Sequence, residues 1–148
     1  MDPLTESEAE LWRAWEAASE ALSQVSAEVA TETGLSEPDL TVLTRLQDIG
    51  GGRLRQSELA AASGWHRSRL SHHLKRMQER GLVDRADVPG GVDVRLTTMG
   101  RAALHRARPV HADAVRRHLV QPLSARDRER LLTLLRKVSP QIGPAPGS

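Results

Sequence analysis

The chain has 148 residues, which suits one domain or one domain with a helical extension, and its lack of cysteine excludes disulfides, thiolate catalysis and cysteine-based metal sites. Tyrosine and phenylalanine are also absent, so the core must be built from leucine, valine, alanine and a few methionines, a composition that favours helix over sheet. The net charge of +2 hides a division, because residues 1–52 hold 2 Lys or Arg against 11 Asp or Glu (−9) whereas residues 53–148 hold 19 against 8 (+11), which indicates a polyanionic partner for the second part.

The N-terminal residues, MDPLTESEAELW, are acidic and lack the basic and apolar segments of a signal peptide. No stretch approaches the roughly 18 apolar residues that a membrane-spanning helix requires. With cysteine also absent, the sequence predicts a cytoplasmic protein that has no membrane partner.

Two helices are expected in the acidic part. Residues 4–31 contain no glycine or proline, and their apolar residues recur at near-helical spacing, so they should form one long helix that Gly34 ends. Ser36 is the expected N-cap of a second helix, because residues 37–39 are good first-turn residues. Its apolar stripe runs from Leu40 to Ile49, and three glycines at 50–52 then break the chain.

Two short helices separated by a glycine turn come next. Ser57 is the expected N-cap of a third helix, ELAAAS, and Gly64 ends that helix in a tight turn. The fourth helix should run from about Arg67 to Arg80, where Gly81 closes it.

A β-hairpin is predicted after the fourth helix. In the segment 92–97, Val92, Val94 and Leu96 alternate with polar residues at the two-residue period of a strand. The sequence PGG at 89–91 is typical of the turn between two such strands.

Two helices complete the chain. The first is expected over residues 98–119, with a kink at Pro109. The second should begin after Ser124 as N-cap, with Asp127 three residues on, and end at Val138. Residues 139–148 are expected to be a disordered tail.

The fourth helix has two unlike faces. On a helical wheel Leu70, Leu74 and Met77 fall together, with His73 at the edge of the same side. The opposite side gathers polar and basic residues, namely Ser68, Arg69, His72, Lys75, Arg76 and Glu79. One face should therefore enter the core while the other presents several cations outward.

A short helix, a glycine turn and a helix with a basic outer face form the helix-turn-helix arrangement, in which the second helix lies in the DNA major groove. The hairpin that follows would be a wing. The first helix and the last two have apolar stripes beyond what a small winged-helix domain can bury. We therefore expect these stripes to be buried in a homodimer interface.

The sequence resembles the MarR family of transcriptional regulators. The blocks that carry the resemblance stand in the family's order and cover nearly the whole chain: GLSEPDLTVLTRL, RLRQSELAAASGWHRSRLSHHLKRMQERGLVDR, VRLTTMGRAAL and PLSARDRERLLTLLRKV. The resemblance implies a single, mainly α domain with a small β-hairpin wing. Residues 36–97 would be the winged helix-turn-helix DNA-binding lobe, and residues 1–35 and 98–138 would be the dimerisation helices.

The resemblance also implies a function and its residues. Such proteins bind pseudo-palindromic operators in double-stranded DNA as homodimers, usually as repressors, and small-molecule effectors commonly release them. Positions on the fourth helix that would meet DNA are Arg67, Ser68, Arg69, Ser71, His72, Lys75 and Arg76. Arg55 and Ser57, at the start of the preceding helix, would contact phosphate.

The wing departs from the family pattern. Family members commonly carry an Asp-Arg-Arg stretch near the wing tip, whose Arg enters the minor groove, whereas the tip here is ADVPGGVDV. Either Arg85 or Arg95 at the wing base reads the minor groove, or the wing contacts only phosphate.

Several residues and the function itself allow other interpretations. Trp15 and Trp65 are candidates for a ligand pocket or for ordinary packing. His73 is expected to be a core-edge histidine that couples acidity to helix packing. No His pair spaced for metal exists, and neither a catalytic motif nor a cofactor motif is present, so we expect no metal, no cofactor and no enzyme. The alternative functions are a winged-helix antirepressor or adaptor that binds protein, and a ligand-binding protein with weak DNA binding.

Overall fold

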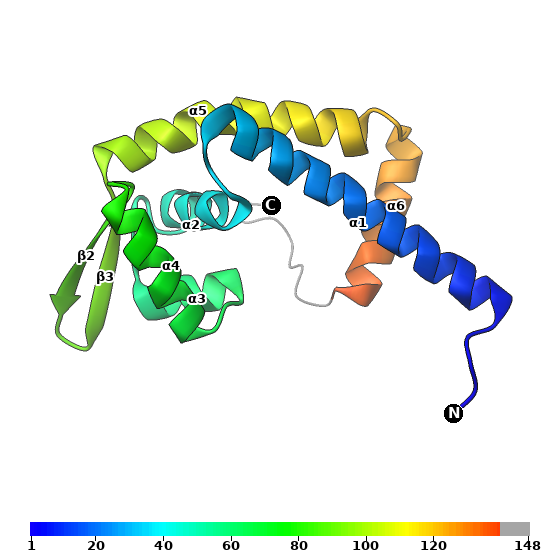
Figure 1. Cartoon of the computed structure of the whole chain (residues 1–148), viewed down its shortest axis with the longest axis horizontal. Helices are drawn as coiled ribbons and strands as arrows, with labels where there is room; N and C mark the ends of the chain where they lie inside the picture. The colour runs from blue at the N-terminus through cyan, green and yellow to red at the C-terminus, as the bar shows by residue number, and fades with distance from the viewer. Residues whose placement is uncertain (140–148) are drawn as a thin grey trace.

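The structure, a computed structural model, describes residues 1–139 of the 148, so the predicted disordered tail lies outside the described residues apart from Ser139. The described chain is mainly helical, with one small antiparallel sheet (Figure 1). In chain order the elements are α1 (Glu6–Thr33), α2 (Glu37–Asp48), β1 (Arg53–Arg55), α3 (Gln56–Ser63), α4 (Arg67–Glu79), β2 (Val83–Val88), β3 (Gly91–Leu96), α5 (Thr98–Val115), a π-helical stretch η1 (Arg116–Val120) and α6 (Ala125–Val138).

Local capping explains where α1 and α2 begin. Thr5 caps α1 and exchanges hydrogen bonds with Glu8, a capping box that the sequence prediction did not identify. Ser36 caps α2 as predicted and forms the same reciprocal pair with Asp39. Gly34 ends α1 as predicted, because its φ of 74° lies in the left-handed region.

The start of α3 differs from the prediction. Ser57 is not the N-cap, because α3 begins at Gln56 and the N-cap position is Arg55, which makes no side-chain capping bond. The reason is tertiary. Residues Arg53–Arg55 form a strand, β1, which pairs antiparallel with β3, and the helix starts as soon as this pairing ends. A strand of three residues shows no period of its own, so only its partner reveals it.

The predicted hairpin is present and belongs to a three-stranded sheet in the order β1-β3-β2. Val83 pairs with Leu96 and Val88 pairs with Gly91, so the turn falls at Pro89 and Gly90 as expected. One residue breaks the predicted alternation: Asp93, expected to face solvent, is only 2% exposed. Because β3 is the central strand, side chains from β1 and β3 itself cover Asp93.

The helix at residues 98–119 was predicted to kink at Pro109. The structure has α5 continuing through Pro109 to Val115 and then turning π-helical over Arg116–Val120. Ser124 caps α6 and accepts a hydrogen bond from the Asp127 N–H, as predicted.

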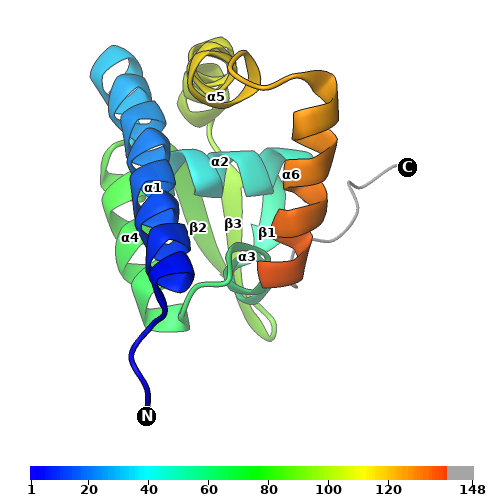
Figure 2. The same cartoon turned by 90° about the vertical axis from the view of Figure 1, so that its right-hand side faces the viewer.

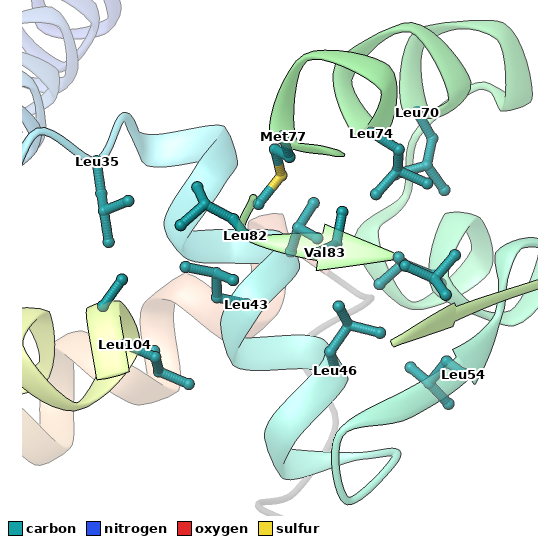
Figure 3. Close-up of a cluster of buried hydrophobic side chains, with 14 of the residues drawn as sticks. Leu35, Leu43, Leu46, Leu54, Leu70, Leu74, Met77, Leu82, Val83 and Leu104 are labelled. Atoms are coloured by element: carbon teal, nitrogen blue, oxygen red, sulfur yellow. The ribbon is translucent and has the colours of Figure 1, made fainter. Parts of the chain in front are cut away.

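The hydrophobic core lies where α2, α3, α4, the sheet and the first half of α5 meet (Figure 3). Leu43 and Leu46 of α2 lie at its centre, and Leu70, Leu74 and Met77 approach them from α4. These five side chains are fully buried. The buried face of α4 thereby fixes which of its residues remain outside.

The remaining helices extend away from this core. α5 leaves the lobe as a long rod, α1 runs beside it, and α6 stands apart beyond its end (Figures 1 and 2). In α1 the buried residues are Val25 and Val29, both in its C-terminal half, and α6 buries none of its residues within the described chain. Leu11, Trp12 and Leu132 are among the exposed apolar side chains on these helices.

Candidate nucleic-acid interface

The outer face of α4 gathers four basic side chains on one surface. Burial of Leu70, His73, Leu74 and Met77 turns the intervening residues outward. The exposed residues are Arg67, Ser68, Arg69, His72, Lys75 and Arg76, while Ser71 is half-buried. Helix α3 lies before α4 and the β2–β3 hairpin follows it (Figure 1), so the arrangement is a winged helix-turn-helix.

The first turn of α4 holds its polar side chains by local contacts. Ser68 Oγ lies 3.1 Å from His66 Nδ1, within hydrogen-bond distance. The guanidinium of Arg69 lies over the ring of Trp65, with Cζ 4.5 Å from the ring centroid. Trp65 packs against the hydrophobic core, so this cation has a rigid support.

Beneath the outer face lies a buried polar cluster that the sequence analysis did not predict. Asp39 of α2 is 2% exposed and receives a hydrogen bond from Arg80 at 2.7 Å. His73 Nε2 lies 3.0 Å from the other Asp39 oxygen, Oδ1. On its far side His73 Nδ1 lies 3.2 Å from Arg76 Nη2. The cluster therefore links α2 to the outer face of α4.

The charges in this cluster follow from its geometry. Burial alone would raise the pKa of Asp39, but hydrogen bonds from Arg80 and from the Ser36 N–H outweigh it and lower the pKa below its usual value of 3.8. Burial lowers the pKa of His73 below 6.5, with Asp39 opposing and Arg76 and Arg80 assisting this shift. Asp39 is therefore ionised and His73 neutral at neutral pH.

Three arginines surround Asp93 at the base of the wing. Arg53 and Arg55 of β1 pair with its carboxylate, Arg55 at 3.3 Å, and Arg95 Nη2 lies 3.9 Å from it. Arg55 also donates to the Pro89 carbonyl in the hairpin turn at 3.0 Å, so it braces the wing against β1. About half of the Arg95 side chain remains exposed.

The other predicted site residues are scattered around this surface. Arg85 donates to Gln78 at the end of α4, which holds it near the wing base. Ser57 is exposed on α3. Arg53 and Asp93 were missed, and the only signal in the sequence was an Asp two residues before Arg95 in the predicted strand.

The two predicted ligand-binding tryptophans lie apart. Trp15 lines an apolar hollow of about 320 Å³ between α1, the end of α5 and α6, together with Leu22 and His118. Trp65 instead packs on the core beside α4. A second hollow, of about 440 Å³, lies between α1, α2 and α5 and is lined by Leu40, Arg108 and His111 among others.

Among residues 1–139 no group of three His, Asp or Glu side chains is placed to hold a metal ion. No helix within this range has the length and apolarity needed to cross a membrane.

Two solved structures are similar to this chain over nearly its full length. AbsC, a MarR family transcriptional regulator from Streptomyces coelicolor, is 29% identical, with a TM-score of 0.87 over 95% of this chain and 97% of that one. Sco3205, a MarR family regulator from the same organism solved in complex with DNA, is 29% identical, with a TM-score of 0.88 over 100% of this chain and 96% of that one.

A more distant structure shares the fold alone. The organohalide-sensing regulator RdhR-CbdbA1625, solved in its 2,4-dichlorophenol-bound form, is 16% identical, with a TM-score of 0.77 over 95% of this chain and 86% of that one. A comparison with curated protein sequences finds no match.

The sequence model of the MarR family matches residues 33–91, the segment from the end of α1 to the wing turn. This segment contains α4 and its basic face. The family consists of transcriptional regulators and not of enzymes, in agreement with the sequence prediction. Residues 33–91 therefore belong to the MarR family, and the whole chain is similar to winged helix-turn-helix, DNA-binding transcriptional regulators of that family.

Proposed function

We propose that this protein acts as a homodimeric repressor that recognises a pseudo-palindromic operator by placing α4 of each subunit in the major groove. The observation that carries the proposal is the division of α4 into a buried apolar face and an exposed face with Arg67, Arg69, Lys75 and Arg76. Arginine can donate two bonds to a guanine edge, and lysine suits phosphate as a point charge.

Individual roles follow from position and support. Arg69 is held on Trp65, and a cation fixed in this way loses little freedom when it binds a base edge. Ser68 and His72 are exposed on the same face and can reach base edges or phosphates. Arg55 is engaged with Pro89 and Asp93, so we assign it a part in bracing the wing as well as phosphate contact.

The wing is proposed to contact phosphate. Its tip carries no arginine, and the exposed cations at its base, Arg53 and Arg95, share the buried charge of Asp93. Charge shared in this way still attracts phosphate, whereas reading of the minor groove would need a side chain that extends freely into it.

The homodimer is proposed from the unpartnered helices. The N-terminal half of α1 and the whole of α6 contain no fully buried residue within the described chain. Helices α1 and α6 nevertheless expose large apolar residues: Leu11, Trp12, Trp15, Leu22, Leu132, Leu134 and Val138. A second copy that covers these helices would remove the apolar surface from water. It would also place two α4 helices about one DNA turn apart, the spacing of adjacent half-sites.

Release by a small molecule is the last part of the proposal. The hollow of about 440 Å³ lies where α1 and α5, the proposed dimerisation helices, meet α2 of the DNA-binding lobe. A ligand held by Arg108 and His111 at this junction would favour one separation of the two α4 helices over another. The binding of 2,4-dichlorophenol by a protein of the same fold makes small phenols a reasonable first screen.

The deciding experiment is selection of genomic DNA fragments by the purified protein, followed by binding titrations at several salt concentrations. We expect enrichment of a palindromic fragment and an affinity that falls steeply with salt. Arg69→Ala should weaken binding to the selected fragment by roughly fivefold or more and reduce discrimination between sites.

Arg106→Ala is the matched control, because Arg106 is an exposed arginine on α5, away from α4. It should leave the affinity for the selected fragment nearly unchanged. If no fragment is enriched and Arg69→Ala binds DNA as wild type does, α4 does not recognise DNA. A protein-binding role is then the better explanation.

A further inference from the structure

His73 lies on the inner side of α4, directly behind the DNA-facing surface, and is 8% exposed. The charged groups that face its ring are Asp39 from α2 and Arg76 and Arg80 from its own helix. From the turn before α4, Trp65 meets the ring edge-on, with centroids 5.9 Å apart and planes at 88°. The ring therefore stands between a buried carboxylate and an arginine of the outer face.

The hydrogen-bond chemistry fixes the protonation state of this ring. A guanidinium can only donate, so the contact of 3.2 Å between Arg76 Nη2 and His73 Nδ1 requires a free electron pair on Nδ1. The ring proton must then sit on Nε2, which faces Asp39 Oδ1 at 3.0 Å. This arrangement fits a neutral imidazole and does not fit an imidazolium.

We infer that His73 is a positioning residue for DNA binding, whose neutral ring holds Arg76 in place on the outer face of α4 and whose protonation displaces Arg76. The inference deepens the proposed function and rests on it, because Arg76 must meet DNA for its placement to matter. Asp39 takes part through its charge, because its buried carboxylate lies 3.0 Å from Nε2.

Protonation would reverse the contact between the two side chains. A proton on Nδ1 turns the acceptor into a donor and sets two cations against each other at hydrogen-bond distance. Arg76 would then leave the ring and recover its rotamer freedom, which binding must remove again. Since burial lowers the pKa of His73, this change belongs to the pH range below 6.5.

The neighbouring residues on α4 supply matched controls. Arg69 is held by the ring of Trp65, which does not titrate, so its contribution to binding should not depend on pH. His72 is exposed on the outer face of α4 and is not part of the Asp39–His73–Arg76 contacts, so His72→Gln is the matched histidine control. His73→Gln keeps an amide that can donate to Asp39 and accept from Arg76, but it cannot titrate.

The first test measures binding to the fragment selected above for wild type, Arg76→Ala, His73→Gln and the double variant. At about pH 8, Arg76→Ala should weaken wild-type binding by roughly fivefold or more, and at a pH below the pKa of His73, which the second test measures, the same substitution should have little effect. In the His73→Gln background the cost of Arg76→Ala should be the same at both pH values. Arg69→Ala should cost the same at both pH values, and His72→Gln should leave the pH dependence of the Arg76→Ala cost as in wild type.

The second test needs no DNA. Ring ¹⁵N chemical shifts of the free protein should report the Nε2–H tautomer of His73, with a pKa below 6.5 that rises in Arg76→Ala. An Nδ1–H tautomer would overturn the inference, as would a titration that Arg76→Ala does not move. This measurement remains decisive if His73→Gln fails to fold.

The two proposals fail differently. A wild-type protein that prefers no fragment at either pH would overturn the proposed function and this inference together. A clear fragment preference with an Arg76 contribution that does not change with pH would overturn the positioning role of His73 and leave DNA recognition standing.

Discussion

Arg80, the C-cap residue of α4, donates a hydrogen bond from Nη1 to Asp39 Oδ2 at the N-terminus of α2, at a distance of 2.7 Å. Its second terminal nitrogen donates to the carbonyl of Gly34, the residue that ends α1, at 3.0 Å. One arginine thus ties α4 to the start of α2 and to the end of α1. The position of α4 relative to α1 depends on this contact as well as on the apolar core.

Replacing Asp39 by Asn should destabilise the protein in a manner that depends on pH. Asn keeps the shape of the side chain but loses the ion pair with Arg80, so the free energy of unfolding at neutral pH should fall by about 1–3 kcal/mol. The pKa of Asp39 lies below 3.8 in the folded protein, so the folded state binds fewer protons than the unfolded state. The stabilisation is therefore complete above 3.8 and is lost as the pH falls through the folded pKa.

Urea unfolding of wild type and Asp39→Asn between neutral and acid pH measures this difference. The control is Asp48→Asn, which breaks the exposed ion pair with Arg108 and should cost less than about 1 kcal/mol. Equal losses for the two variants at neutral pH would show that the buried carboxylate has no special role.

Arg95→Ala should weaken DNA binding without changing its sequence preference. Arg95 is exposed at the wing base, and a phosphate contact there carries no base information. The slope of log affinity against log salt should fall by about 1 per contact removed, and the affinity for all fragments should fall together. A loss confined to fragments with one particular flanking sequence would instead indicate that Arg95 reads the minor groove.

Introducing charge on α6 should break the proposed homodimer. Leu132 and Leu134 are exposed in the described chain, and glutamate at both positions would place uncompensated charges in the proposed interface. Sedimentation should then show monomers, and affinity for a palindromic fragment should fall steeply. Ile49→Glu is the control, because Ile49 is equally exposed but lies on the DNA-binding lobe after α2. A dimer that survives the double substitution would place the interface elsewhere.

Gly100→Ala should destabilise the junction between the wing and α5. A Cβ at this position would overlap the backbone carbonyl of Leu82, which cannot move without shifting the strand after α4. Overpacking of this kind costs about 1–3 kcal/mol, which thermal unfolding can measure. Gly91→Ala is the control, because its Cβ would meet only the Arg55 side chain, at 3.7 Å. The prediction is wrong if both substitutions are equally harmless.

Strong local signals made several elements predictable. The two faces of α4 could be read from the period of Leu70, Leu74 and Met77, since burial in a helix follows its 3.6-residue repeat. Ser36 and Ser124 were recognisable as N-caps because an acidic residue follows each of them three positions later. The hairpin followed from PGG between two alternating segments.

Long-range contacts decided what the sequence could not. Strand β1 and the displaced start of α3 depend on pairing with β3, which lies about forty residues further along the chain. The burial of Asp93 depends on arginines from β1, and the Asp39–His73–Arg76 contacts depend on how α4 packs against α2. No local pattern encodes which polar side chains become neighbours when two elements dock.

The sequence by itself determined the helices, the wing turn and the basic face of α4, because periodicity, capping residues and glycine turns act within a few residues of each other. Only the tertiary structure decided which polar groups are buried together and how Arg69 and Arg76 are supported from behind. A buried carboxylate or a neutral histidine owes its state to partners that only folding brings within hydrogen-bond distance.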